Sequence, residues 1–370
     1  MIKLLIVDDS ALMRKLLETI FQEEGDFDIR LARNGKEAIE VVRAFDPHVV
    51  TLDVQMPEMD GLACLNHIML EGPRPVVMIS ALTGDGADTT LEALEQGAID
   101  FIAKPSGAVS LEIDRLRPII VEKVRGAAQA PIRRTIRLTE RIRHQLRKRP
   151  DAEKPPRLDH KPAPRAKSSQ GKSSEGGGLV LIGASTGGPI ALDIVLSQFP
   201  AGFPWPVVVA QHMPAGFTAT FAKRLDRLCA LRVVEVNRPM PLQAGTIYIA
   251  RGDADVTVAR RSEEIAVMSV PAQKDYPWHP SVERMVSSAL EHFDATRLVG
   301  VLLTGMGRDG ADAMTRMRQQ GGRTIAEAES TATVWGMPGE LVQNGGAEFV
   351  RPIEDVTATV LQMVESNALC

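Results

Sequence analysis

A short glycine-rich run places a serine where it could act as a nucleophile. Residues 183–189 follow a strand-like apolar segment and precede a helical one, and the first five of them fit the pattern G-x-S-x-G. Small residues around the serine permit a tight turn that exposes its hydroxyl above the edge of a sheet. Ser185 is therefore a candidate nucleophile. The alternative is that Ser185 only caps the following helix, which is a common role for serine.

The same run could instead hold a phosphate group, because glycine-rich loops at helix N-termini bind the phosphates of nucleotides. The run lacks the lysine of a P-loop and the full G-x-G-x-x-G pattern, and no acidic residue follows at the expected strand end. Nucleotide binding is therefore the weaker interpretation.

A serine nucleophile needs a general base, and the second half of the chain has three histidines. His212 follows a strand-like segment at 207–210, so it would lie at the same sheet edge as Ser185 if the two strands are neighbours. His279 lies in a proline-flanked loop and is the second choice, with shaping of the pocket as its alternative role. His292 lies in a helical stretch, where a solvated side chain is expected. We predict that His212 is the base.

An acid that orients the base is expected at a third strand end. Asp309 follows the strand-like segment 298–303 through a glycine-containing turn, which favours it over Asp312 in the next helix. Taken alone, Asp309 could equally cap that helix. Together with Ser185 and His212 it forms a candidate catalytic triad. The chain order serine, histidine, aspartate differs from that of α/β-hydrolases and indicates a separate hydrolase lineage.

The first part of the chain has a different set of polar residues at strand ends. Asp8 and Asp9 follow the first strand-like segment, Asp53 ends the third, Ser80 ends the fourth and Lys104 follows the fifth. Three carboxylates brought together would repel one another without a cation, and hard oxygen ligands suit Mg²⁺. A carboxylate beside Mg²⁺ can attack a phosphoryl donor, and Asp53 is the candidate. Each acid taken alone is more commonly a helix cap or an exposed turn residue.

Alternating strand-like and helical segments would position these side chains. Five such pairs fill residues 1–122, and a second alternation begins at residue 179. This predicts an α/β fold: a flavodoxin-like unit with a five-stranded parallel sheet, then a doubly wound hydrolase unit with a mostly parallel sheet. Residues 233–268 lack helical segments and are expected to form a small antiparallel excursion. The strand-like segments lie at 3–7, 29–32, 49–52, 76–79 and 99–102, then at 179–182, 207–210, 232–236, 246–250, 256–259, 298–303 and 323–326.

A basic segment separates the two alternations. Residues 123–172 carry 16 basic and 4 acidic side chains, in a chain whose net charge is -4. We expect a basic helix at 133–149 and then a flexible tether at 150–177, because Pro, Ser and Gly bury too little apolar surface to become ordered. The segment is interpreted as a solvated linker rather than a nucleic-acid-binding region. The predicted domains are therefore 1–122, 123–177 and 178–367.

Composition limits the class of protein. Of the 370 residues, 44% are apolar and 24% are charged, which is typical of globular proteins. No apolar run approaches the roughly 18 residues that cross a bilayer, so no membrane insertion is expected. The N-terminus lacks the pattern of a secretory signal, which predicts a cytoplasmic location. Three scattered cysteines suggest neither a disulfide framework nor a zinc site.

The first unit contains the segments LIVDDS at 5–10, LDVQMPEMDG at 52–61 and DFIAKP at 100–105. With these segments the unit, over about residues 1–122, resembles a response-regulator receiver domain. The resemblance implies that a chemosensory histidine kinase phosphorylates Asp53. It also implies that Asp8 and Asp9 hold Mg²⁺ together with Asp53, and that Ser80 and Lys104 sense the phosphoryl group.

Besides the serine run, the second unit contains the segments QHMP at 211–214, PSV at 280–282, TGMGRDG at 304–310 and WGMP at 335–338. With these segments the unit, over about residues 179–365, resembles the catalytic domain of the chemotaxis protein-glutamate methylesterases, the CheB family. It implies hydrolysis of glutamate methyl esters on the cytoplasmic helices of methyl-accepting chemoreceptors, with release of methanol. It also implies deamidation of particular glutamines, and a role in adaptation during chemotaxis or in a related chemosensory pathway.

The resemblance also assigns roles to single residues. Ser185 would attack the ester, His212 would carry the proton, and Asp309 would orient the imidazole ring. Backbone N–H groups near Met306 would stabilise the oxyanion, in a pocket that includes Thr186 and Gly187. Mg²⁺ is implied for the receiver, and no cofactor is implied for the esterase reaction.

Two other functions would fit parts of this sequence. One alternative is a phosphorylation-controlled receptor-binding module whose hydrolase site is degenerate, but the intact set of triad residues argues against it. A transcription regulator is less supported, because no helix-turn-helix or zinc pattern follows the receiver.

The chain is expected to be a monomer without a nucleic-acid partner. In the unphosphorylated state, the receiver is expected to restrict access to Ser185.

Overall fold

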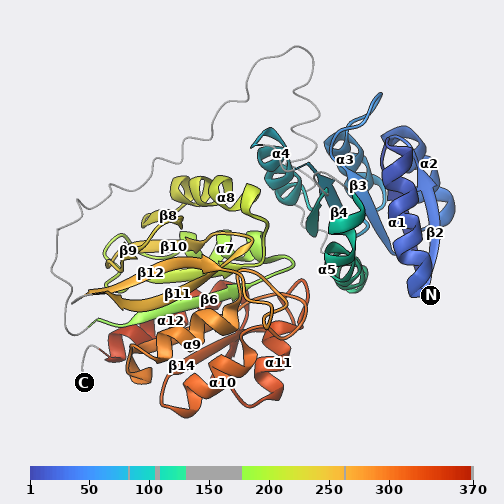
Figure 1. Ribbon diagram of the computed structural model, residues 1–370. Coiled ribbons are helices and arrows are strands. Elements are labelled where there is room, and N and C mark those ends of the chain that lie inside the picture. The colour runs from blue at the N-terminus through green and yellow to red at the C-terminus, as the bar shows by residue number, and fades with distance from the viewer. Residues whose placement is uncertain (82–83, 105–108, 131–176, 262–263, 368–370) are drawn as a thin grey trace. The chain divides into compact units, whose positions relative to one another are not determined.

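The computed structural model describes residues 1–81, 84–104, 109–130, 177–261 and 264–367. The chain divides into two compact units, Met1–His160 and Lys161–Cys370, and each has its own main β-sheet (Figure 1). The predicted basic helix at 133–149 and nearly all of the predicted tether at 150–177 lie outside the described residues, so the domain boundaries stay predictions. Within the described ranges, no helix has the length and apolar character needed to span a membrane.

The N-terminal unit is the predicted five-stranded parallel sheet with helices on both faces (Figure 1). Its strand order is 2-1-3-4-5, and every pair is parallel. The strands are β1 (Ile2–Val7), β2 (Phe27–Ala32), β3 (Val49–Asp53), β4 (Val76–Ser80) and β5 (Asp100–Ala103). The helices are α1 (Ala11–Glu24), α2 (Gly35–Phe45), α3 (Gly61–Glu71), α4 (Gly84–Glu95) and α5 (Val109–Gln129).

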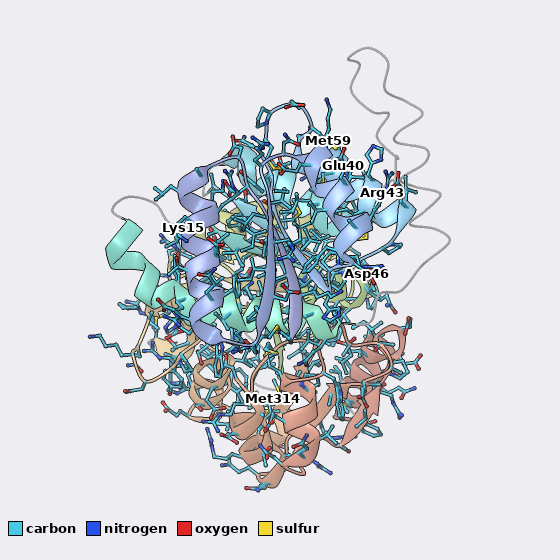
Figure 2. All side chains as sticks on the ribbon, turned by 90° about the vertical axis from the view of Figure 1, so that its right-hand side faces the viewer. Lys15, Glu40, Arg43, Asp46, Met59 and Met314 are labelled. Atoms are coloured by element: carbon cyan, nitrogen blue, oxygen red, sulfur yellow. The ribbon has the colours of Figure 1, made fainter. Side chains whose placement is uncertain are left out.

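The two faces of this sheet are covered by different helices. Helix α1 packs against α5, whereas α2 packs against α3, and Lys15 on α1 and Arg43 on α2 accordingly lie on opposite sides of the strands (Figure 2). Because both faces are covered, the central strands can be apolar throughout, and β3 and β4 are buried at every position. The strand order reverses between β1 and β3, so their carboxyl ends form the usual ligand crevice of such a sheet.

The C-terminal unit has a seven-stranded sheet and a separate three-stranded sheet. The large sheet contains β6 (Leu179–Ala184), β7 (Val207–Gln211), β8 (Arg232–Val236), β10 (Thr246–Ala250), β13 (Leu298–Leu302), β14 (Arg323–Glu327) and β15 (Phe349–Arg351). The small antiparallel sheet contains β9 (Met240–Pro241), β11 (Ala254–Arg261) and β12 (Glu264–Pro271). The helices are α7 (Gly188–Ser197), α8 (Ala215–Leu228), α9 (Val282–Leu290), η1 (Ala295–Arg297), α10 (Ala311–Gln319), α11 (Met337–Gln343) and α12 (Ile353–Asn367).

The predicted antiparallel excursion within 233–268 is confirmed for β9, β11 and β12. Strands β8 and β10 of the same stretch instead join the large sheet, whose pairs are all parallel. Strand β10 lies between β7 and β8 and is buried at every position, so its apolar run suits the interior of the large sheet. The short edge strand β15 was not predicted, because three partly exposed residues give little periodic signal.

Strand β6 occupies the middle of the large sheet, whose order is 15-14-13-6-7-10-8. The chain moves from β6 to β7 on one side, whereas β13 joins on the other side much later, so the strand order reverses at β6. The carboxyl ends at such a reversal form a crevice for ligands. The last residues of β6 and β7, Ala184 and Gln211, lie opposite each other. The residues that follow them directly are the predicted catalytic residues Ser185 and His212.

Candidate active site

The side chains of Ser185, His212 and Asp309 form a continuous chain of hydrogen bonds. His212 Nδ1 lies 3.1 Å from Ser185 Oγ, and His212 Nε2 lies 2.8 Å from Asp309 Oδ2. The three residues are only 7%, 8% and 5% exposed, respectively. A hydroxyl, a ring nitrogen that can accept its proton and a carboxylate that orients the ring are the groups that activate a serine nucleophile.

Ser185 does not cap the helix that follows it. Helix α7 begins after Gly187, which has a φ of 79°, and no side chain caps its N-terminus. The Ser185 N–H donates to the Thr304 carbonyl at 3.0 Å, and the hydroxyl faces His212. The glycine-rich run is therefore a turn that presents the Ser185 hydroxyl to His212, and the capping alternative is excluded.

The Asp309 carboxylate caps a helix other than the one that follows it. Helix α10 begins after Gly310 without a side-chain cap. The donors to the carboxylate oxygens are the Ser281 hydroxyl at 3.1 Å, the N–H groups of Val282 at 2.6 Å and Glu283 at 3.0 Å, and His212 Nε2 at 2.8 Å. Two of them are backbone amides at the N-terminus of α9, whose partial positive charge stabilises an anion. The carboxylate is thus fixed in place and holds the imidazole ring.

The two weaker sequence alternatives do not take part in this chain of hydrogen bonds. Asp312 is exposed, and its carboxylate accepts from Asn344 Nδ2 at 3.1 Å. His279 Nδ1 lies 2.8 Å from Asp255 Oδ1. Its neighbour Trp278 is parallel to the His212 ring, with the ring centroids 6.2 Å apart. The loop that carries His279 therefore lies beside the His212 ring.

Asp255 is a buried carboxylate beneath that loop, with 1% of its surface exposed. Besides His279, it accepts from the Ser281 N–H at 2.9 Å and from Arg284 Nη1 at 2.8 Å. Burial alone would raise the pKa of Asp255, but the bonds from His279, Ser281 and Arg284 hold it below its usual value. The charged carboxylate therefore anchors the start of α9, the same helix end that holds Asp309.

The loop after β13 supplies the candidate oxyanion site. A Cβ atom added to Gly305 would lie 2.8 Å from the Ser185 Cβ, so the backbone of this loop passes directly beside the nucleophile. The Ser185 N–H is already bonded to the Thr304 carbonyl. Within the described part of the chain, the Met306 N–H has no acceptor. Because a developing oxyanion requires a donor that is not already bonded, the Met306 N–H is a candidate for that role.

The other two predicted pocket residues lie in the serine turn. Thr186 is fully buried, and its carbonyl accepts from the Thr304 hydroxyl at 2.9 Å. Gly187 forms the N-terminal boundary of α7. These contacts join the serine turn to the loop that carries Met306, so the nucleophile and the candidate oxyanion donor belong to one connected structure.

The described cysteines do not compete with Ser185 as nucleophiles. Cys64 and Cys229 are buried free thiols. Burial raises the pKa of each to about 12, so neither forms a thiolate at neutral pH.

The acidic residues of the N-terminal unit come together as predicted. Carboxylate oxygens of Asp8, Asp9 and Asp53 lie within 4.8 Å of one another, and Asp9 is the exposed member. Lys104 Nζ lies 2.7 Å from Asp53 Oδ2 and 3.0 Å from Asp8 Oδ2. One lysine leaves three carboxylates with net negative charge, and hard oxygen ligands of this kind fit Mg²⁺.

The electrostatics of this cluster favour a bound cation. Burial raises the pKa of Asp53 above its usual value, and the charge of Asp8 adds to this effect against the opposing influence of Lys104. Burial alone would lower the pKa of Lys104, but its pairing with Asp53 and Asp8 raises it. Ser80 lies at the end of β4, and among the described residues its hydroxyl contacts the carbonyls of Ala81 and Gly86 rather than the carboxylates.

Comparison with known proteins covers both units. Residues 180–360 match the CheB methylesterase family, and residues 4–113 match the response regulator receiver domain. A protein of Rhodopseudomonas palustris (strain BisB18), named protein-glutamate methylesterase/protein-glutamine glutaminase 2, is 64% identical over 369 residues, which are 100% of both chains. This chain belongs to the CheB methylesterase family. The resemblance inferred from the sequence is thereby confirmed over both units.

Other family members are more distant. A Rhodospirillum rubrum protein-glutamate methylesterase/protein-glutamine glutaminase 3 is 52% identical over 95% of this chain and 93% of its own. The solved catalytic domain of Thermotoga maritima CheB is 34% identical and covers 51% of this chain and 99% of that one, with a TM-score of 0.49. The response regulator domain of the same protein is 41% identical and covers 35% of this chain and 98% of that one, with a TM-score of 0.33.

Sequence reasoning missed the residues that hold Ser185, His212 and Asp309 in place. Ser281 precedes an amphipathic helical stretch and caps α9 through a bond from the Arg284 N–H, a role that its position could have indicated. Gln211 ends β7 beside the base, and its carboxamide is buried behind the serine turn. Asp255 gave no signal, because its partners lie about two dozen positions further along the chain.

Proposed function

We propose that this protein is a phosphorylation-activated hydrolase that demethylates glutamate methyl esters on chemoreceptors and deamidates particular receptor glutamines. The observation that carries the proposal is the hydrogen-bonded chain from Ser185 through His212 to Asp309. The relatives support the substrate class, since they are named protein-glutamate methylesterase/protein-glutamine glutaminase.

Acylation begins with attack of Ser185 Oγ on the ester carbonyl, while His212 Nδ1 takes the hydroxyl proton. The tetrahedral intermediate places its negative oxygen against the Met306 N–H, and a donor of this kind contributes roughly 10²- to 10³-fold to kcat in related hydrolases. The imidazolium then gives its proton to the leaving methoxide. Methanol departs, and the glutamyl group remains bound to Ser185 as an ester.

Deacylation repeats these steps with water as the nucleophile. His212 Nδ1 removes a proton from the water and then returns it to Ser185 Oγ, which releases a receptor glutamate. If the substrate is a glutamine side chain, the first leaving group is ammonia and the final product is the same glutamate. One acyl-enzyme therefore accounts for both activities.

The orientation of the imidazole ring decides which nitrogen acts as the base. The Asp309 carboxylate accepts a hydrogen bond from His212 Nε2, so it favours the tautomer of the ring that carries its proton on Nε2. The lone pair of Nδ1 is then directed to Ser185 Oγ. When Nδ1 takes the serine proton, the carboxylate stabilises the resulting imidazolium.

The receiver supplies the control. A chemosensory histidine kinase donates a phosphoryl group to Asp53. Mg²⁺ would be held by Asp8, Asp9 and Asp53, and it would neutralise charge on the incoming phosphoryl group. Lys104 exchanges its ion pair with Asp53 for one with the phosphoryl oxygens, and Ser80 responds to the same group. The kinase and the cytoplasmic receptor helices both imply a cytoplasmic location.

Methanol release from membranes that contain methylated receptors tests the proposal. The wild-type protein should release methanol, and Ser185→Ala should bind the same membranes without releasing it. If the wild type binds receptors but releases no methanol, the protein is the degenerate binding module considered as the alternative.

A further inference from the structure

We propose that Gln211 is a positioning residue that holds the nucleophile and the base of the esterase site in register. The inference rests on the proposed function, because it concerns the geometry between Ser185 and His212. Gln211 is the last residue of β7 and is 2% exposed. It therefore acts through the backbone of its neighbours rather than by touching the substrate.

The carboxamide of Gln211 joins the two catalytic residues directly. Its Nε2 donates to the Ser185 carbonyl at 2.9 Å and to the His212 carbonyl at 3.1 Å. One amino group thus uses both of its hydrogens to connect the loop after β6 with the loop after β7. The Gln211 side chain thereby joins the backbones of Ser185 and His212 through a single group.

These two bonds from Gln211, called the clamp below, add to others that hold the backbones of Ser185 and His212. The Ser185 N–H donates to the Thr304 carbonyl at 3.0 Å, and the His212 N–H donates to the Ala184 carbonyl at 3.0 Å. With Gln211 bound to the two carbonyls, both backbone groups of each catalytic residue are held. These bonds restrict how far the two backbones can shift, and so they limit changes in the distance between Ser185 Oγ and His212 Nδ1.

Packing by itself does not account for a carboxamide at this position. Gln211 Oε1 is buried and accepts no hydrogen bond from the described residues. Burying a polar atom without a partner is unfavourable, and an apolar side chain of the same length would fill the space without that penalty. The two hydrogen bonds from Nε2 are therefore the reason for the carboxamide. The NH₂ group, and not Oε1, must face the Ser185 and His212 carbonyls, because both carbonyl oxygens are acceptors.

Gly188 provides the space that the carboxamide needs. A Cβ atom added to Gly188 would lie 1.9 Å from Gln211 Oε1. Gly188 is the first residue of α7, and its own N–H donates to the Ser185 carbonyl at 2.8 Å. A larger residue at position 188 would push the carboxamide away from the carbonyls that it holds.

The first test replaces Gln211 by methionine, which has the same length and no donor. The kcat for methanol release should fall by roughly 10- to 100-fold, because small misplacement of reacting groups has effects of this size. The KM for receptor membranes should stay unchanged, because the residue is buried. Rates are normalised to active sites titrated with a serine-reactive fluorophosphonate, so misfolded molecules are not counted. Gln198→Met, which removes an exposed bond to the Ile194 carbonyl, is the matched control and should keep the wild-type kcat.

The second test uses pH. In Gln211→Glu, the introduced carboxyl has a single O–H group when it is protonated, so it can then donate to one of the two carbonyls. The ionised carboxylate can donate to neither. Once ionised, it places negative oxygens against the two carbonyl oxygens. The kcat of this variant should therefore fall as pH rises through the titration of the introduced carboxyl, a limb that the wild type lacks. A residue that only filled space would produce no such limb.

The third test is a double-mutant cycle between positions 188 and 211. Gly188→Ala should lower kcat by displacing the carboxamide, and Gln211→Ala should lower it by removing the clamp. In the double variant the added methyl group meets no carboxamide, so the two losses should not add. Contact of that methyl group with Ala184 Cβ, at 2.9 Å, occurs in both backgrounds and cancels in the cycle.

Three results would overturn the inference: a wild-type kcat per active site in Gln211→Met, a Gln211→Glu profile without the falling limb, or fully additive losses in the cycle. Failure of the proposed function gives a different result. In that case the fluorophosphonate would not label Ser185, or Ser185→Ala would still release methanol, whatever the Gln211 variants do.

Discussion

Removing the Asp309 carboxylate should stop catalysis and also weaken the fold around α9. In Asp309→Ala the His212 ring loses its partner at Nε2, 2.8 Å away, so it can rotate and can carry its proton on either nitrogen. The imidazolium also loses the charge that stabilises it. Loss of the equivalent acid in other serine hydrolases lowers kcat by about 10⁴-fold, and we expect a similar loss here.

The effect on stability can be worked out from the bonds that are lost. The N–H groups of Val282 and Glu283 both donate to Asp309 and are left without an acceptor in the variant. Each buried donor left unpaired costs about 1–3 kcal/mol, so the free energy of unfolding should fall by about 2–6 kcal/mol. The lower part of this range applies if water fills the space of the carboxylate.

Ser281→Ala is the matched variant that separates the two effects. It removes the cap of α9 and one donor to Asp309, at 3.1 Å, and should cost about 1–3 kcal/mol of stability. The carboxylate keeps its other three donors, so kcat should stay within roughly tenfold of the wild type. Both variants are assayed for methanol release well below their melting temperatures. If Asp309→Ala retains more than a few per cent of the wild-type kcat, or if the two variants lose kcat equally, the assignment of Asp309 is wrong.

Three further predictions concern charge and the receiver. The pKa of Asp255 is lower in the folded protein than its ordinary value of 3.8. Its ionised form therefore stabilises the fold fully at pH values above that ordinary pKa, and this stabilisation is lost as pH falls through the lower folded-state pKa. Asp255→Asn should therefore lower the free energy of unfolding by about 1.5–3 kcal/mol at pH 7, and a difference from the wild type that does not shrink toward pH 3 would contradict this. Asp53→Asn should abolish labelling by acetyl phosphate while methanol release by the unphosphorylated protein continues, and label on the variant would move the phosphorylation site to another residue. Chelation of Mg²⁺ should prevent labelling of Asp53 but not the basal esterase reaction, and loss of that basal reaction would indicate a metal at the esterase site.

The residues at strand ends could be predicted from sequence because a parallel sheet gathers its carboxyl ends at one edge. Ser185 and His212 each follow an apolar strand, and the pairing of Ala184 with Gln211 brings those two ends together. Asp8 and Asp53 meet for the same reason in the receiver, where β1 and β3 are neighbours. In both units, a local pattern and one rule of topology were sufficient.

The bonds that hold the triad could not be predicted in this way. Asp309 binds the N-terminus of α9, which begins 27 positions earlier in the chain, and no periodicity links the two. The same holds for Asp255, whose carboxylate anchors α9 from the start of β11. The role of His279 likewise followed only from its contact with Asp255. These contacts form because separate helices and strands pack together, and the local sequence around each residue does not predict them.

In the proposed function, one chain hydrolyses receptor methyl esters at Ser185 under the control of Asp53. The most direct measurement is the initial rate of methanol release from methylated receptor membranes by the wild type and by Ser185→Ala, each with and without a phosphodonor. The wild type should have a basal rate that rises on phosphorylation, and Ser185→Ala should release no methanol in either condition. Release by Ser185→Ala, or a wild-type rate that the phosphodonor leaves unchanged, would refute this function.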